Sequence, residues 1–160
     1  MKLFSSLAGI VYGFVSMILI PLIIIDVNSL LHLPVYQSVL FQVAGFLFVL
    51  SGGLLLICST YLFAKLGKGG SPLPFDPPKK LVIEGIYKYI RNPMFTASAL
   101  IWLGEFLFFG SILLLPYAVV WIVANHLHLI FQDEKWLEQR YGEEYLEYKK
   151  KTPRYMPKLV

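Results

Sequence analysis

Two long stretches of this chain carry no charged side chain, and they constrain its fold more than any other feature. They are residues 3–25 and 35–64. A transmembrane helix needs about 20 mostly apolar residues to cross a hydrocarbon core of about 30 Å, and both stretches are long enough. Only 15% of the residues are charged, whereas a soluble domain carries about 25%. We therefore expect a membrane protein and exclude an ordinary soluble domain.

Two further apolar segments follow, 94–109 and 111–131, with Gly110 between them. So short a break between two helices forces an antiparallel hairpin. The first segment is short for a full span, and Pro116 predicts a kink in the second. The predicted fold is all-α, with about four transmembrane helices that include this C-terminal hairpin.

The distribution of lysine and arginine orients these helices, because cytoplasmic segments carry the excess of both residues. Four crossings place the N-terminus, residues 65–91 and the tail after Gln132 at one face, and that face then holds all 14 basic residues. We expect both termini and the polar segments to be cytoplasmic. The chain is predicted to be one membrane domain, 1–160, made of two N-terminal spans (1–64), a polar loop (65–93), the hairpin (94–131) and a C-terminal helix with its tail (132–160).

The polar loop has two parts. Residues 67–80 are rich in glycine and proline but lack the GxxxxGK[ST] order of a phosphate-binding loop, so we interpret them as a stiff connection. Asn92 then suits the cap of a helix and Pro93 its first turn. Arg91 beside the free N–H groups of that helix start would favour a carboxylate or phosphate. Alternatively, Arg91 belongs to an interfacial belt at the membrane surface.

The tail is predicted to form an amphipathic helix. Its apolar and aromatic side chains recur at helical spacing: Leu137, Tyr141, Tyr145 and Tyr148. The face that they form can lie on the membrane or cover the polar loop. A purely structural alternative is a helix whose basic end is attracted to anionic lipid. That alternative does not account for Asp133 and Glu134 at the exit of the last span, where a carboxylate pair needs a cation.

The motifs in the second half of the chain resemble a known superfamily. Residues 81–95 read Leu-Val-x-x-Gly-x-Tyr-x-x-x-Arg-Asn-Pro-Met-Phe, and after them come His126, the acidic pair, Tyr141-Gly142-x-x-Tyr145-x-x-Tyr148 and Pro153. Over residues 67–157 this pattern resembles the isoprenylcysteine carboxyl methyltransferase and phospholipid methyltransferase superfamily. The resemblance implies a small integral membrane enzyme that binds S-adenosylmethionine between the loop, the hairpin and the C-terminal helix, and releases S-adenosylhomocysteine.

The resemblance also implies a set of site residues. The positions that match cofactor contacts are Lys79, Lys80, Leu81, Val82, Gly85, Tyr87, Asn92, Pro93, Met94, Phe95 and Asp133, and those that match catalytic positions are Arg91, His126 and Glu134. Two positions depart from the family pattern. Asp133 is one methylene shorter than the usual Glu, and Leu129 stands where the eukaryotic isoprenylcysteine enzymes have an arginine implicated in substrate binding.

The chemistry of the cofactor agrees with these residues. Its carboxylate suits Arg91 and a helix start, and its sulfonium and ammonium suit Asp133 and Glu134. A carboxylate acceptor needs no general base, whereas an amine acceptor must lose a proton, for which His126 or Glu134 is a candidate. A buried structural histidine is the alternative for His126. His126 and His128 do not share a helix face, so we expect no metal site from this pair.

The predicted function is methyl transfer from S-adenosylmethionine to a lipophilic acceptor. The acceptor that we favour is a prenylcysteine-type carboxylate or a similar amphiphile, and the alternative is a phosphatidylethanolamine-type amine. Two other hypotheses stay open: an NADPH enzyme like the sterol reductases, and a noncatalytic membrane adaptor. The expected partners are the lipid bilayer and this acceptor. No nucleic acid or metal is expected, and the oligomeric state is not predicted.

Overall fold

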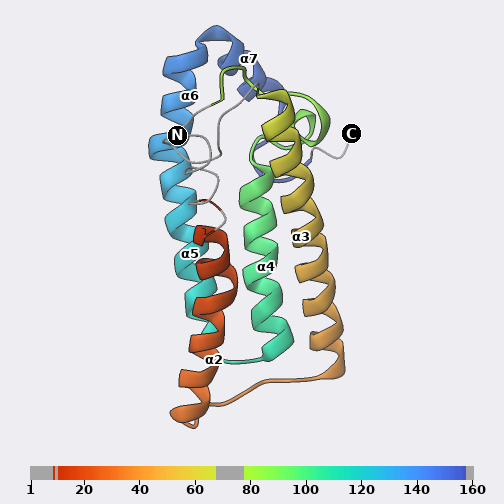
Figure 1. The fold of residues 1–160 in the computed structure, drawn as a ribbon, viewed down its shortest axis with the longest axis vertical. Helices are drawn as coiled ribbons and strands as arrows, with labels where there is room; N and C mark the ends of the chain where they lie inside the picture. Colours follow the sequence, from red (N-terminus) through yellow and green to blue (C-terminus); the bar gives the residue numbers. More distant parts are fainter. Residues whose placement is uncertain (1–8, 10, 68–77, 158–160) are drawn as a thin grey trace.

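The computed structural model describes residues 9, 11–67 and 78–157, and the helices in these ranges form one elongated bundle (Figure 1). In chain order the elements are a π-helical turn (Val15–Leu19), α2 (Ile20–Leu30), α3 (Val39–Leu66), a 3-10 turn (Gly85–Lys88), α4 (Pro93–Phe109), α5 (Leu114–His128), a second π-helical turn (Leu129–Asp133), α6 (Glu134–Tyr141) and α7 (Glu143–Lys151). The predicted all-α fold is confirmed. Most of the glycine- and proline-rich connection, residues 68–77, lies outside the described residues.

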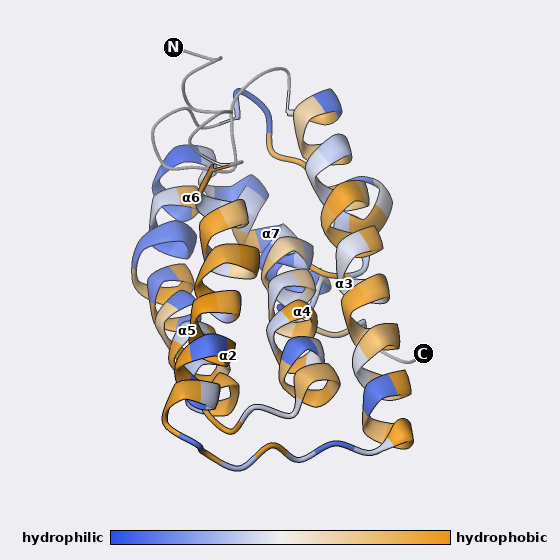
Figure 2. Ribbon diagram, turned by 60° about the horizontal axis from the view of Figure 1, so that its bottom comes forward, coloured by the Kyte–Doolittle hydropathy of each residue, from blue (hydrophilic) through white to orange (hydrophobic). Residues whose placement is uncertain are grey.

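The long helices are those of a membrane protein. Val11–Leu30, Val39–Leu66 and Leu114–Tyr141 are each long and apolar enough to cross a bilayer. The 17 residues of α4 reach only about 26 Å at 1.5 Å per residue, so α4 is short for a span, as expected. Most residues of α2 and α3 are apolar (Figure 2), and helices with so little polar surface belong in lipid or in a large core. The chain is a multi-pass integral membrane protein.

The helix boundaries at the second half of the chain differ from the sequence expectation. Leu114–Tyr141 is one uninterrupted helix, so the predicted C-terminal helix does not begin after Gln132. The break comes at Gly142, whose positive φ of 54° ends α6. Pro116 lies at the third residue of α5, where the backbone N–H would have no intrahelical acceptor, so this proline removes no helical hydrogen bond.

The first span also runs farther than predicted, because the helix continues through Asp26 to the end of α2. The connection to α3 is therefore short, and it packs against the turn between α4 and α5. Tyr36 N donates to Gly110 O at 2.8 Å, and Asn28, which is buried, accepts from Leu113 N at 3.3 Å. Gly110 has a φ of +66°, and a Cβ there would meet Tyr36 O. These contacts close the end of the bundle opposite the polar segments.

Glycines set the close packing of α3 on α4. A Cβ on Gly45 would lie 2.5 Å from Phe108 N, and one on Gly52 would lie 2.8 Å from Ala97 O. Gly104 of α4 lies in the same contact, because a Cβ on Gly104 would lie 2.8 Å from Gly45 O. In lipid no hydrophobic effect drives helices together, so such close backbone approach supplies the van der Waals attraction.

The first π-helical turn ties α2 to the hairpin. The ring of Pro21 has no N–H, so it cannot donate to the carbonyls of the preceding turn. The Ser16 carbonyl instead accepts hydrogen bonds from Trp102 Nε1, at 3.3 Å, and from Tyr117 OH. Trp102 and Tyr117 belong to α4 and α5, so one freed carbonyl joins the first span to both helices of the hairpin.

Candidate active site

The start of α4 lies against the tail that follows α7. Arg91 N donates to Pro153 O at 2.9 Å, and Asn92 N donates to Arg154 O at 3.1 Å. Pro93 then begins the helix, where its missing N–H is harmless. The predicted helix start is thus confirmed. The backbone N–H groups of Arg91 and Asn92 are already paired with the tail, which sequence reasoning did not anticipate.

The Arg91 side chain is buried, and its Nε and Nη1 groups are hydrogen-bonded. Its Nε donates to Thr152 O at 2.9 Å, and its Nη1 donates to Glu134 Oε1 at 3.1 Å and to Tyr145 OH at 3.2 Å. Only 7% of the side chain is exposed. Arg91 therefore joins α4, α6 and α7, which an interfacial side chain reaching towards the membrane surface would not do.

Glu134 is the centre of this cluster. Its carboxylate accepts two hydrogen bonds from Arg154, from Nε at 2.8 Å and from Nη2 at 3.0 Å. Lys149 Nζ lies 3.3 Å from Glu134 Oε2 and 2.7 Å from Glu138 Oε1. The prediction that a carboxylate at this position needs a cation is confirmed.

The cluster carries net positive charge, because the cations of Arg91, Lys149 and Arg154 outnumber the carboxylates of Glu134 and Glu138. The hydrogen bond to Glu138, reinforced by Glu134, raises the pKa of Lys149. The hydrogen bond to Glu134 likewise raises the pKa of Arg154. Lys149 and Arg154 therefore stay charged at neutral pH, and the cluster suits an anionic group.

Aromatic side chains of the tail cover the end of the polar loop. Leu81, Tyr145 and Tyr148 form a buried core against which Leu137 and Tyr141 pack. Tyr141 OH donates to Pro78 O at 2.7 Å, and Tyr148 OH donates to Tyr87 O at 2.5 Å. The aromatic face was predicted to lie either on the membrane or over the polar loop, and it lies over the loop. Burial raises the pKa of both Tyr145 and Tyr148.

A second group of side chains lies where α4 faces α5. His126 Nδ1 is hydrogen-bonded to Tyr155 OH. The centroid of the Phe95 ring lies 4.6 Å from that of Tyr155 and 6.4 Å from that of His126. Thr96 Oγ1 fixes this end of the tail by donating to Tyr155 O at 3.0 Å. His126 therefore faces the start of α4, with its ring held by a hydroxyl group.

Several predicted site residues take other places. Asp133 Oδ1 pairs with His128 Nε2 at 3.3 Å on a half-exposed surface, so only Glu134 of the acidic pair meets Arg91. The side chains of Lys79 and Lys80 are exposed, and Val82 and Met94 make none of the polar contacts described above.

Tyr87 and Gly85 have clear structural roles. Tyr87 OH donates to Ser59 O of α3 at 3.2 Å, so its hydroxyl is already in use. Gly85 has a φ of +61°, and a Cβ there would lie 2.7 Å from Leu62 Cδ1. Both residues fix the 3-10 turn on α3.

Sequence reasoning missed the residues that the tail contributes: Lys149, Thr152, Arg154 and Tyr155. Their basic members were interpreted as a lipid-attracting end. The one available signal was the acidic pair itself, because a buried carboxylate requires cations that the tail can reach.

The fold and this cluster define a multi-pass membrane protein with a charged, partly buried site at one end of its helices. A family model described as phospholipid methyltransferase matches residues 40–144, which is more than half of the chain. The chain belongs to the phospholipid methyltransferase family, within the superfamily that it was expected to resemble. No curated protein matches it.

Methyltransferases of this family generally use S-adenosylmethionine. Two features of the site fit this cofactor. Asn92 Nδ2 is a buried donor with no acceptor among the described residues. A carboxylate, hydroxyl or ring nitrogen of a ligand would satisfy it. The net positive charge beside it suits the carboxylate of a methionine group.

Proposed function

We propose that this protein transfers a methyl group from S-adenosylmethionine to a lipophilic acceptor at the end of the bundle where Arg91 and Glu134 meet. The observation that carries the proposal is the buried Arg91–Glu134 pair, 3.1 Å apart, in a chain of a methyltransferase family. It unites the start of α4, the exit of the last span and the tail.

When bound, S-adenosylmethionine supplies a methyl group already activated by its sulfonium. The protein has to orient the donor and the acceptor and to exclude water. We assign Arg91 and the buried Asn92 amide to the carboxylate end of the cofactor, with Pro93, Met94 and Phe95 beside them. Leu81, Val82, Gly85 and Tyr87, with the backbone of Lys79 and Lys80, form the wall that the tail covers.

Glu134 acts through its charge in this proposal. A carboxylate that already accepts hydrogen bonds from Arg91 and Arg154 is a weak base. Its role is to hold those guanidinium groups together and to balance part of their charge. Asp133 lies on the neighbouring surface and is assigned to the cationic part of the cofactor only through the family resemblance.

The acceptor is proposed to be an amphiphile that enters from the bilayer. A prenylcysteine-type carboxylate is already deprotonated and can attack the methyl carbon without a base, so it needs only alignment. A phospholipid amine has to lose a proton, and His126, held by Tyr155, is the group suited to receive it. The description of the matching family names phospholipid, and Leu129 stands where the eukaryotic isoprenylcysteine enzymes have an arginine implicated in substrate binding, so the amine is retained as an equal candidate.

Binding of S-adenosylhomocysteine by the purified protein in detergent tests the cofactor site. Calorimetry is expected to show saturable binding that Arg91→Ala weakens about tenfold or more, the loss of a charge-assisted hydrogen bond. Arg140→Ala is the matched control, because Arg140 is exposed and stacks on Trp136. Equal weakening in both variants, or binding of NADPH instead, would overturn the assignment.

Membranes that contain the protein, incubated with methyl-labelled S-adenosylmethionine, identify the acceptor. Label in phospholipid supports the amine, and label in an added prenylated thiol compound supports the carboxylate. No label in any lipid, with cofactor bound, would contradict methyl transfer to a lipophilic acceptor.

We further propose that the chain is one domain whose termini and site face the cytoplasm. The support is that the basic residues of the described segments gather at the end of the bundle that holds α7. In a Cys58→Ser background, an impermeant maleimide added to spheroplasts should label Ser29→Cys and not Lys150→Cys. The reverse pattern would overturn the orientation.

A further inference from the structure

A buried carboxylate lies far from the proposed active site. Glu105 is on α4, 8% exposed, and its Oε2 has no hydrogen-bond donor among the described residues. It is 14 positions beyond Arg91 in the chain, which is about 21 Å along a helix at 1.5 Å per residue. The two groups therefore cannot share one small ligand.

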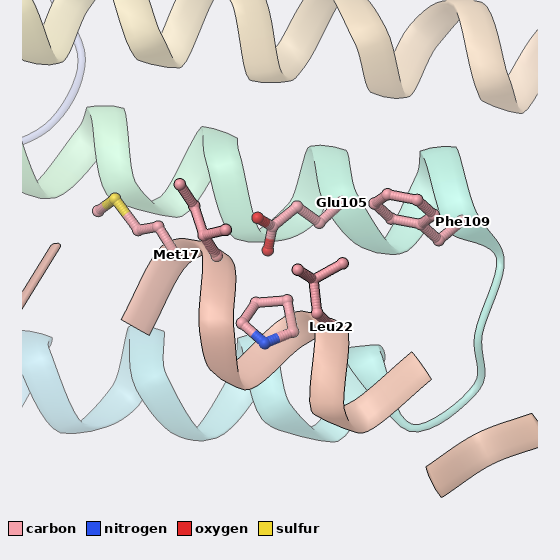
Figure 3. A pocket seen from close by; sticks show the side chains of 6 residues that line it. Met17, Leu22, Glu105 and Phe109 are labelled. Carbon is pink, nitrogen blue, oxygen red and sulfur yellow. The ribbon is translucent and has the colours of Figure 1, made fainter. Parts of the chain in front are cut away.

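Glu105 points into a cavity between α4 and the first span (Figure 3). The cavity measures about 150 Å³, and the other side chains that line it are apolar: Met17, Ile18, Pro21, Leu22 and Phe109. Ile18 and Leu22 are about half exposed. Because these two residues face the surrounding lipid, the cavity can be reached sideways from the bilayer.

No cation of the described residues serves this carboxylate. The described lysines and arginines lie at the other end of the bundle from Glu105. They are at the end of α3, in the segment before α4, and in α6, α7 and the residues after α7. An acidic side chain inside a membrane span is costly and ordinarily faces a partner or a ligand path. Glu105 has the apolar cavity in front of it and no partner group from the described residues.

We propose that this cavity is a second binding site, which takes a lipophilic ammonium: an amphiphile with one amine and a single apolar chain. The ammonium pairs with the Glu105 carboxylate, and the chain lies along Leu22 and Phe109 into the bilayer. A neutral alcohol of the same length lacks the charge that the carboxylate requires. This inference does not depend on the proposed methyl transfer, because it uses none of the residues of that site.

The test uses the full chain in phosphatidylcholine nanodiscs and a bromine-tagged dodecylamine, which quenches tryptophan on contact. Trp102 is buried on α4, one turn before Glu105, and reports the ligand. Saturable quenching is expected, and Glu105→Gln, which keeps the side-chain shape, should weaken the amine about tenfold. The matching bromine-tagged alcohol should be insensitive to the same substitution.

Two controls keep the test sharp. Asp26→Asn removes an exposed carboxylate from the same end of the bundle and should leave amine binding unchanged. Leu22→Trp fills the cavity while keeping the Glu105 side chain and should abolish saturable quenching of the other tryptophans. Amine binding that is the same in wild type and Glu105→Gln, or a loss shared equally by amine and alcohol, would overturn the proposal. Arg91→Ala should bind the amine as wild type does.

Discussion

Arg91 and Glu134 are joined by a buried hydrogen bond of 3.1 Å although 43 positions separate them in the chain. The bond links Arg91, two positions before α4, to the first residue of α6. Because Arg154 and Lys149 bind the same carboxylate, Glu134 also holds the tail in place. Glu134 therefore docks the tail together with the backbone hydrogen bonds from Arg91 and Asn92 to Pro153 and Arg154.

Glu134→Gln is expected to release the tail even without a cofactor. The substitution leaves the Arg91 guanidinium buried without its charge partner, and breaking a buried pair in this way costs about 3 kcal/mol. Limited proteolysis of the detergent-solubilised protein should cut the tail after α6 faster in the variant, and its thermal midpoint should fall.

Glu138→Gln is the control for that experiment. Among the described residues Glu138 pairs with Lys149 only, and its side chain is 34% exposed, so this pair contributes at most about 1 kcal/mol. Equal proteolysis rates in the two variants would show that Glu134 does not organise the tail.

The contact between α3 and α4 makes a second prediction. Gly45→Ala places a Cβ 2.5 Å from Phe108 N, which the helices can relieve only by separating. We expect a loss of about 1–3 kcal/mol, as for other overpacked contacts, measured by thermal unfolding in detergent. Gly53→Ala is the matched control on the same helix, because a Cβ at Gly53 would have no atom of the described residues within 4 Å. A midpoint for Gly45→Ala as high as that of Gly53→Ala would contradict the close approach.

Much of the fold could be predicted from the sequence, because apolar length alone identifies a helix in lipid. The charge-free segments predict the spans, and Gly110 predicts the hairpin turn. In the structure Gly110 lies in that turn with a φ of +66°. The helix boundaries do not follow from apolar length. Nothing in the local sequence distinguishes a helix that stops at Gln132 from one that continues to Tyr141, since both choices satisfy the backbone.

The candidate site was predictable only where a motif carried it. The start of α4 was expected from Asn92 and Pro93, and the pairing of Glu134 with a cation from the cost of a buried carboxylate. The identity of those cations was not, because Arg154 reaches Glu134 through a turn of the tail. Such a long-range contact leaves no periodic signal in the sequence.

The buried tyrosines of α7 predict a pH dependence. Burial raises the pKa of Tyr145 and Tyr148 above the usual value of about 10. The folded protein holds these protons more tightly than the unfolded chain, so their contribution to stability is complete below about pH 10 and is lost as the pH rises further. Tyrosinate absorbance should show a late titration step that accompanies release of the tail.

The late step should shrink in the Tyr145→Phe, Tyr148→Phe double variant, and Tyr87, whose pKa burial also raises, should keep the remainder. Tyr89→Phe is the control, because Tyr89 is exposed, and it should leave the late step intact. A single titration step for all tyrosines of the folded protein would contradict their burial.

Tyr155→Phe separates the two candidate acceptors through His126. The substitution removes the hydrogen bond between Tyr155 OH and His126 Nδ1 and keeps the ring that packs on Phe95. If His126 receives a proton from an amine, misorientation of its ring should lower kcat for an amine acceptor by about tenfold, within the range of general-base effects. KM for S-adenosylmethionine should not change, and neither should methyl transfer to a carboxylate acceptor. A parallel loss with both acceptors would show that Tyr155 only supports the fold, since a structural defect does not depend on which acceptor is methylated.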